Sequence, residues 1–140
     1  MAAECTFSGD WMMNYDANGQ ICEFFQQHDL KYYDRQVNNQ VIYQCGINCK
    51  TTRLEAAMMA TDNRMLVTVL IPTRIPEGAR PMMLEAIARM NWGLSYGRFE
   101  MDLSDGELRF YNALMLADGE VPEISTIGKL FAYAIGTTER

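Results

Sequence analysis

The chain has 140 residues, the usual length of one globular domain with a single core. Hydrophobic residues make up 49% of the sequence and charged residues 21%, so most of the chain is expected to fold. The net charge of −6 and the pI near 4.7 argue against binding to nucleic acid or to an anionic membrane, because both attract basic patches.

The sequence favours a cytoplasmic protein. No apolar run reaches the roughly 18 residues that cross a bilayer, since Thr68, Pro72 and Arg74 interrupt the best candidate. The first ten residues lack the cationic start and apolar segment of a secretory signal. The four cysteines are therefore expected to be reduced thiols, and a strand would hold Cys45 and Cys49 too far apart to share a disulfide or a zinc ion.

The N-terminal region divides into a lead-in and a helix. Residues 1–15 show no hydrophobic period and are expected to form an irregular lead-in, which leaves residues 16–140 as a single domain. Asp16 or Asn18 can cap a helix that runs to about Asp29. Three apolar residues and the only histidine recur there at helical spacing: Ile21, Phe24, Phe25 and His28. We expect this histidine to be structural or at the solvent edge.

Four strands are expected between residues 31 and 71. Residues 31–35 contain two adjacent tyrosines, and residues 41–49 alternate between an apolar and a mostly polar face. Asp62-Asn63 indicates a tight turn that joins the next two strands, residues 53–60 and 64–71. With that turn every facing pair on one side is apolar: Ala60 with Met65, Met58 with Val67, Ala56 with Val69 and Leu54 with Ile71. The other side is also largely apolar, so this hairpin is expected to be central and partly covered on both faces.

A second helix follows a connection that contains two prolines. Pro81 suits the first turn of this helix, and Gly93 is expected to end it in the left-handed conformation. The expected buried stripe recurs at helical spacing and consists of Met83, Ile87, Met90 and Leu94.

A hairpin is predicted around Asp105-Gly106, a pair typical of two-residue turns. That turn would place Leu103 opposite Leu108, Met101 opposite Phe110 and Phe99 opposite Asn112 on an apolar face. On the polar face it would pair Asp102 with Arg109 and Glu100 with Tyr111.

A last helix is expected from Pro122 to Gly136. Its buried stripe comprises Ile124, Ile127, Phe131 and Ile135. The element order is therefore α-β-β-β-β-α-β-β-α. Short connections favour antiparallel pairing, so we predict an α+β fold in which helices pack on an antiparallel sheet.

Several motifs in the second half of the chain carry a family resemblance. They are Leu70-Ile71-Pro72, Ile75-Pro76-Glu77, the run Ala88-Arg89-Met90-Asn91-Trp92-Gly93-Leu94, the run Gly97-Arg98-Phe99-Glu100-Met101-Asp102, and Asp105-Gly106-Glu107-Leu108-Arg109. In this order and spacing, the chain from about Glu23 to its end resembles the YbjN family of bacterial sensory transduction regulators. The segment before Asp16 has no counterpart in that resemblance, and the last helix stops soon after Gly136, where relatives often continue.

The resemblance implies a fold similar to that of type III secretion chaperones, which bind partner polypeptides and commonly dimerise. It implies a non-enzymatic protein without a cofactor. The family-motif residues are interpreted as structural: Asn91, Trp92, Gly97, Phe99, Asp102, Asp105 and Gly106.

The residues themselves point to no catalytic or metal site. The chain has no glycine-rich phosphate loop, Gly-x-Ser-x-Gly elbow, His-Glu-x-x-His or Cys-x-x-Cys motif. Glu100 and Asp102 lie on one face of a strand and could bind a metal or transfer protons. Because Arg109 is predicted to face Asp102, a solvated ion pair is the favoured interpretation.

Two functional hypotheses follow. The first is a chaperone-like or regulatory interaction module that binds an unknown partner polypeptide through an apolar surface, with eleven methionines as adaptable contacts. A homodimer is expected from the chaperone analogy and from sheet edges that need cover. The second is a small-molecule-binding or enzymatic domain with a pocket between the helices and the sheet.

Overall fold

The computed structural model describes residues 17–38, 40–50, 52–61, 63–117 and 120–139. The predicted lead-in, residues 1–15, lies outside them. The helical elements are α2 (Ala17–Gln27), the 3-10 turn η1 (Glu77–Ala79), α3 (Arg80–Trp92) and α4 (Ile124–Glu139). The strands are β1 (Tyr32–Val37), β2 (Gln40–Asn48), β3 (Arg53–Ala60), β4 (Arg64–Ile71), β5 (Arg98–Met101) and β6 (Leu108–Met115).

The strands form one antiparallel sheet in the order β1-β2-β3-β4-β6-β5. Consecutive strands are neighbours from β1 to β4, because tight turns join them. The chain then leaves the sheet through η1 and α3, and it returns so that β6 pairs with β4 and β5 becomes an edge strand. The predicted α+β class and element order are confirmed.

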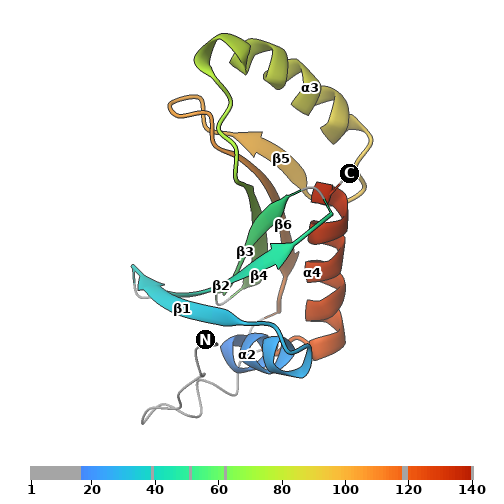
Figure 1. Cartoon of the computed structure of the whole chain (residues 1–140). Helices are drawn as coiled ribbons and strands as arrows, with labels where there is room; N and C mark the ends of the chain where they lie inside the picture. The colour runs from blue at the N-terminus through green and yellow to red at the C-terminus, as the bar shows by residue number, and fades with distance from the viewer. Residues whose placement is uncertain (1–16, 39, 51, 62, 118–119, 140) are drawn as a thin grey trace.

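Two helices cover one face of the sheet. Figure 1 shows α2 and α4 in contact with each other on that face, with α3 apart from α2 near β5. The predicted stripe of α2 is buried at Ile21, Phe24 and Phe25, and Phe25 also stacks on Tyr32 of β1. Full burial of side chains of this size contributes roughly 1.5–3 kcal/mol each, so this layer carries most of the core.

The central hairpin has the predicted register. Ala56 pairs with Val69 and Met58 with Val67, and all four side chains are buried beneath the helices. The other face of β3 and β4 has no described helix over it, because α2 and α4 lie on the same side of the sheet. The expectation that this hairpin is partly covered on both faces agrees with its burial, since Leu66 is buried and Ala57 and Met59 are half-buried, but no described helix supplies the cover on this second face.

The β5–β6 hairpin differs from its predicted register. Phe99 pairs with Phe110 and Glu100 with Arg109, a shift of two residues along β6. The connecting loop is longer than two residues, since Asp102 and Glu107 close it through a backbone hydrogen bond of 2.9 Å. An even shift keeps each side chain on its predicted face, so the apolar face remains apolar. The predicted pairing of Asp102 with Arg109 is wrong.

Both later helices depart from their expected ends. Gly93 follows α3 with a φ of −93°, so the helix ends without a left-handed residue. The last helix passes through Gly136 to Glu139, and Thr137 is buried near its end.

Of the stripe predicted for α3, Ile87 is buried but Met90 remains 42% exposed. The reason is position: α3 packs mainly on η1 and the short β5 rather than on the sheet face.

The cysteines only partly match the expectation. Cys45 is a free thiol buried in β2, and burial raises its pKa to about 11, so the thiol stays neutral. Cys22 on α2 is disulfide-bonded, which corrects the expectation of four reduced thiols.

Candidate interaction surfaces

The carboxylates that the sequence left open for chemistry are engaged in local structure. Partial burial would raise the pKa of Glu100, but hydrogen bonds from Arg98 at 2.6 Å and Arg109 at 2.8 Å outweigh it and lower the pKa. Asp102 accepts hydrogen bonds from the hydroxyl and backbone N–H of Ser104, and these lower its pKa. Among the described residues, no three histidine, cysteine or acidic side chains could together hold a metal ion.

Asn91 connects α3 to the free edge of the sheet. Its side-chain Nδ2 donates to the carbonyl of Phe99 at 3.1 Å, and its Oδ1 accepts from the N–H of Phe99 at 2.8 Å. The amide group thus makes the two hydrogen bonds that another strand would make at this position. Phe99 itself is buried and contacts the ring of Phe110, so Asn91 helps to seal β5 against further pairing.

Two glycines allow close contacts beside the same hairpin. Gly97 has a φ of +75°, and a Cβ on it would lie 2.5 Å from the Phe110 ring. Gly106 has a φ of +79°, and a Cβ there would lie 2.2 Å from the carbonyl oxygen of Ile75. Both positions therefore require glycine.

The loop before β6 is fixed to the connection that leads into α3. Ile75 donates its backbone N–H to Gly106 at 2.9 Å, and Arg74 pairs with Asp105. Asp105 also accepts from the N–H of Glu107 at 2.9 Å, and these interactions lower the pKa of Asp105. The Asp-Gly pair that the sequence assigned to a turn thus also docks a distant segment.

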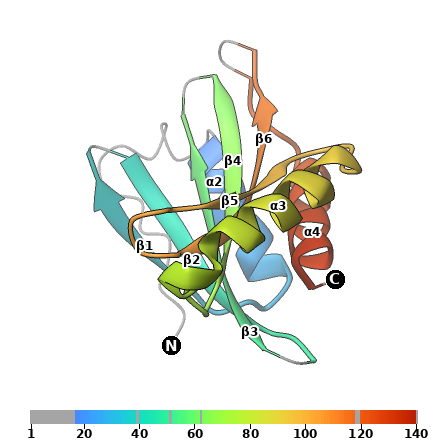
Figure 2. The same ribbon diagram turned by 90° about the horizontal axis from the view of Figure 1, so that it is seen from above.

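Trp92 has a different environment from the other family-motif residues. Its side chain is 92% exposed at the end of α3, and Met82 on the same helix is 76% exposed. Leu84 and Met90 are also exposed but lie on other sides of the helix, whereas Met82 and Trp92 lie about 80° apart around its axis, and we call these two residues the α3 surface. Figure 2 shows α3 running beside β5, which leaves the outer side of the helix in solvent.

The second candidate is the sheet face opposite α2 and α4, which we call the open face. Its apolar side chains come from alternate positions of four strands: Ile42, Ala57, Met59, Leu66, Leu70, Ala113 and Met115. Ile42, Ala57 and Met59 are half-buried, Leu66 is buried between them, and a hollow of about 380 Å³ lies among these strands. The sequence signal for this face is the second apolar side of the central hairpin, which by itself predicts partial burial and not a binding surface.

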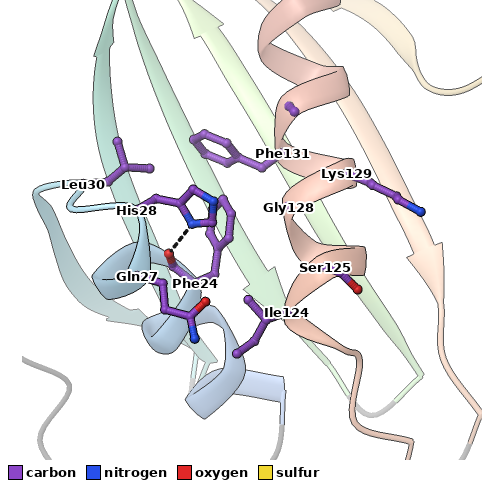
Figure 3. A pocket seen from close by; sticks show the side chains of 10 residues that line it. Phe24, Gln27, His28, Leu30, Ile124, Ser125, Gly128, Lys129 and Phe131 are labelled. Carbon is purple, nitrogen blue, oxygen red and sulfur yellow. Dashed lines mark hydrogen bonds between the residues drawn. The ribbon is translucent and has the colours of Figure 1, made fainter.

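A pocket of about 770 Å³ lies between α2 and α4 (Figure 3). Its lining is largely apolar, with Phe24 and Phe131 packed against each other. His28 lies over Phe24 with its exposed ring and donates from Nδ1 to the Phe24 carbonyl at 3.0 Å. Lys129 extends away from the pocket in Figure 3. The histidine thus lies at the solvent edge, as predicted.

No helix of the described chain has the length and apolar character needed to cross a membrane.

Comparisons with known proteins agree with this fold. A family model named YbjN, "Putative bacterial sensory transduction regulator", matches residues 19–139. The solved structure "Crystal structure of YbjN, a putative transcription regulator from E. coli" is similar with a TM-score of 0.64 at 9% sequence identity. That similarity covers 87% of this chain and 85% of the other, and at this identity it shows the fold alone. No curated protein matches the sequence. Since the family model extends over nearly the whole chain, the protein belongs to the YbjN family.

Proposed function

We propose that this protein is a non-enzymatic, chaperone-like or regulatory module that binds a partner polypeptide through an apolar surface. The observation that carries the proposal is the α3 surface, where Trp92 and Met82 project into solvent from a helix with few core contacts. Tryptophan is enriched among the residues that dominate binding energy, and methionine adapts to differently shaped partners. The family description as a regulator supports the same class of function.

The engaged carboxylates and the neutral Cys45 thiol support a non-enzymatic role. Glu100 accepts from two arginines, and Asp102 is bound to Ser104 within its own loop. A catalytic acid or base needs a side chain able to reach a substrate proton. Both carboxylates instead stabilise the hairpin.

The experiment is affinity capture from native cell extract with the wild-type chain, Trp92→Ser and Met82→Ser, followed by mass spectrometry. We expect a partner that the wild type retains and both variants lose, because each removes apolar area from the α3 surface. Val121→Ser is the matched control, since Val121 is an exposed apolar side chain that lies before α4 and not on α3. A partner retained equally by all four chains would exclude the α3 surface.

We also propose that, in the absence of its partner, the protein forms a homodimer through the α3 surface, so that the dimer and the partner complex exclude each other. Glu85 and Arg89 pair with each other at 3.0 Å, so two copies can meet there without bringing an unpaired charge into contact. Light scattering at high micromolar concentration should give twice the monomer mass for the wild type and the monomer mass for Trp92→Ser. A monomeric wild type would refute the dimer.

Cytoplasmic location is a separate proposal, against which the disulfide bond of Cys22 counts, because disulfides are rare in the cytosol. Fractionation of the native cells tests it. Recovery of the protein with the membrane or periplasmic fraction would contradict it.

The α2–α4 pocket favours a second candidate function, the binding of a small apolar molecule. Its volume lies within the roughly 300–1,000 Å³ of typical ligand pockets. A ligand that binds the folded state raises the melting temperature, so a thermal-shift screen of apolar metabolites tests this candidate. Gly128→Leu should abolish any such shift, because a Cβ at this position already reaches 3.4 Å from Phe24.

A further inference from the structure

The open face carries a straight row of side chains across five strands. The register aligns Arg35 of β1 with Ile42, Met59, Leu66 and Ala113. At about 4.8 Å between neighbouring strands, the apolar part from Ile42 to Ala113 is roughly 14 Å wide. This is wider than the roughly 10 Å diameter of a helix, so one helix can rest on the row.

The charges on this face are opposite in sign to the charge of the whole chain. Five arginines point to this side: Arg35, Arg53, Arg64, Arg98 and Arg109. The facing carboxylates on the strands are Glu55, which pairs with Arg53, and Glu100, which Arg98 and Arg109 share. Glu107, before β6, also lines the hollow on this face and contacts Arg74 at 3.8 Å. The face therefore carries five arginines against three carboxylates, in a chain whose net charge is −6.

Two of these arginines border the apolar row without an ion pair among the described residues. Arg35 lies at the β1 end of the row and donates from Nε to Gln44 at 2.9 Å. Arg64 is two residues from Leu66 on β4, roughly 7 Å along the same face. Both side chains are exposed, so their guanidinium groups are available to a partner's carboxylates.

From this arrangement we infer that the open face binds an acidic amphipathic helix of a partner polypeptide. The inference rests on the proposed function, the binding of a partner polypeptide, and adds a second site separate from the α3 surface and the chemistry of the segment that it takes. Apolar side chains of the helix would cover Ile42, Met59 and Ala113, above the buried Leu66, and its flanking carboxylates would meet Arg35 and Arg64. Backbone groups on a sheet face are already paired within the sheet, so an occupant must satisfy its own backbone, as a helix does.

Nucleic acid fits this face less well. Glu55 and Glu100 lie among the arginines and would repel phosphates, and the row from Ile42 to Ala113 has no aromatic side chain. Tyr111 lies on the same face, but Arg98 lies over its ring at 4.3 Å from the centroid. Single-stranded nucleic acid binds to aromatic platforms in positively charged grooves, whereas an apolar row suits an apolar helix stripe.

The test uses two designed peptides of about 18 residues with the same leucine stripe at i, i+3, i+4 and i+7. One peptide carries glutamate on both sides of the stripe, and its twin carries lysine there. Titration of the full chain by calorimetry should show the glutamate peptide binding at least about tenfold more tightly at low salt. NMR shift changes should centre on Ile42, Met59 and Ala113.

Charge exchange provides the specificity control. The double variant Arg35→Glu with Arg64→Glu should lower the affinity for the glutamate peptide about tenfold and raise the affinity for its lysine twin, because the charge complementarity is reversed. Arg89→Glu on α3 changes charge by the same amount elsewhere and should alter neither affinity. Circular dichroism of each variant verifies the fold, and both exchanged side chains are exposed.

The outcomes separate this inference from the proposed function. Equal binding of both peptides, or shifts centred on α3, would overturn the inference. Preferential binding of a single-stranded oligonucleotide or of anionic vesicles at the same residues would overturn it too. A native partner that the Arg35/Arg64 variant still captures, and Trp92→Ser loses, would preserve the proposed function and reject the open face as its site.

Discussion

At the scale of single residues, Asn91 makes the two hydrogen bonds to the edge strand β5 that a neighbouring strand would otherwise make. Asn91→Ala would leave the N–H and carbonyl of Phe99 without these partners beside a buried ring. We expect the free energy of unfolding to fall by about 1–3 kcal/mol in urea denaturation. Asn48→Ala is the control, because Asn48 is exposed and accepts only from Arg53; its effect should stay within about 0.5 kcal/mol. Equal effects of the two substitutions would remove the special role of Asn91.

Glu100 makes a pH-dependent contribution at the same scale. Its pKa is lowered in the folded state, so the unfolded state binds more protons around that pKa and stability rises with pH. The contribution is present above the unfolded value, near 4.3, and is lost as pH falls through the folded pKa. Glu100→Gln should therefore cost about 1 kcal/mol at neutral pH and less in acid. Denaturation curves of both chains from neutral to acid pH test this, and a difference that grows in acid would contradict it.

At the scale of elements, the two hairpins show what sequence alone can determine. The β3–β4 register was predictable because alternation fixes which residues are buried, and a slip of one position would expose them. The β5–β6 register was not, because Asp102 and Asp105 hold the loop through their own side chains and Ile75 joins it from afar. An Asp-Gly pair does not reveal such contacts.

The same loop provides a prediction about how α3 is held. Gly106→Ala would force a Cβ against the backbone of Ile75 at a positive φ, so the loop and the connection to α3 must separate. We expect a loss of more than about 1 kcal/mol in unfolding free energy. Gly78→Ala in η1 is the matched control, since a Cβ there has open space. The expectation fails if the two substitutions have similar effects.

At the scale of the whole molecule, the position of α3 could not be predicted from its own sequence. Its periodic residues, including Met83 and Met90, fit a buried helix, but their exposure depends on which element lies beneath them. Because α3 packs on a short edge strand rather than on the main sheet, its apolar residues remain partly in solvent. The sequence likewise shows that the open face is apolar, but it does not show that no helix lies over this face. That depends on the side of the sheet to which α2 and α4 return.

The two surfaces lie on different parts of the fold, so their binding functions should be independent. α3 contacts mainly η1 and β5, whereas the apolar row of the open face belongs to β2, β3, β4 and β6. Trp92→Ser should therefore abolish the dimer in light scattering and leave the affinity for the glutamate peptide unchanged within about twofold. Arg35→Glu with Arg64→Glu should have the reverse effect. If Trp92→Ser also lowered the affinity for the glutamate peptide, the two surfaces would be energetically coupled, and the helix-binding face would have to extend to α3.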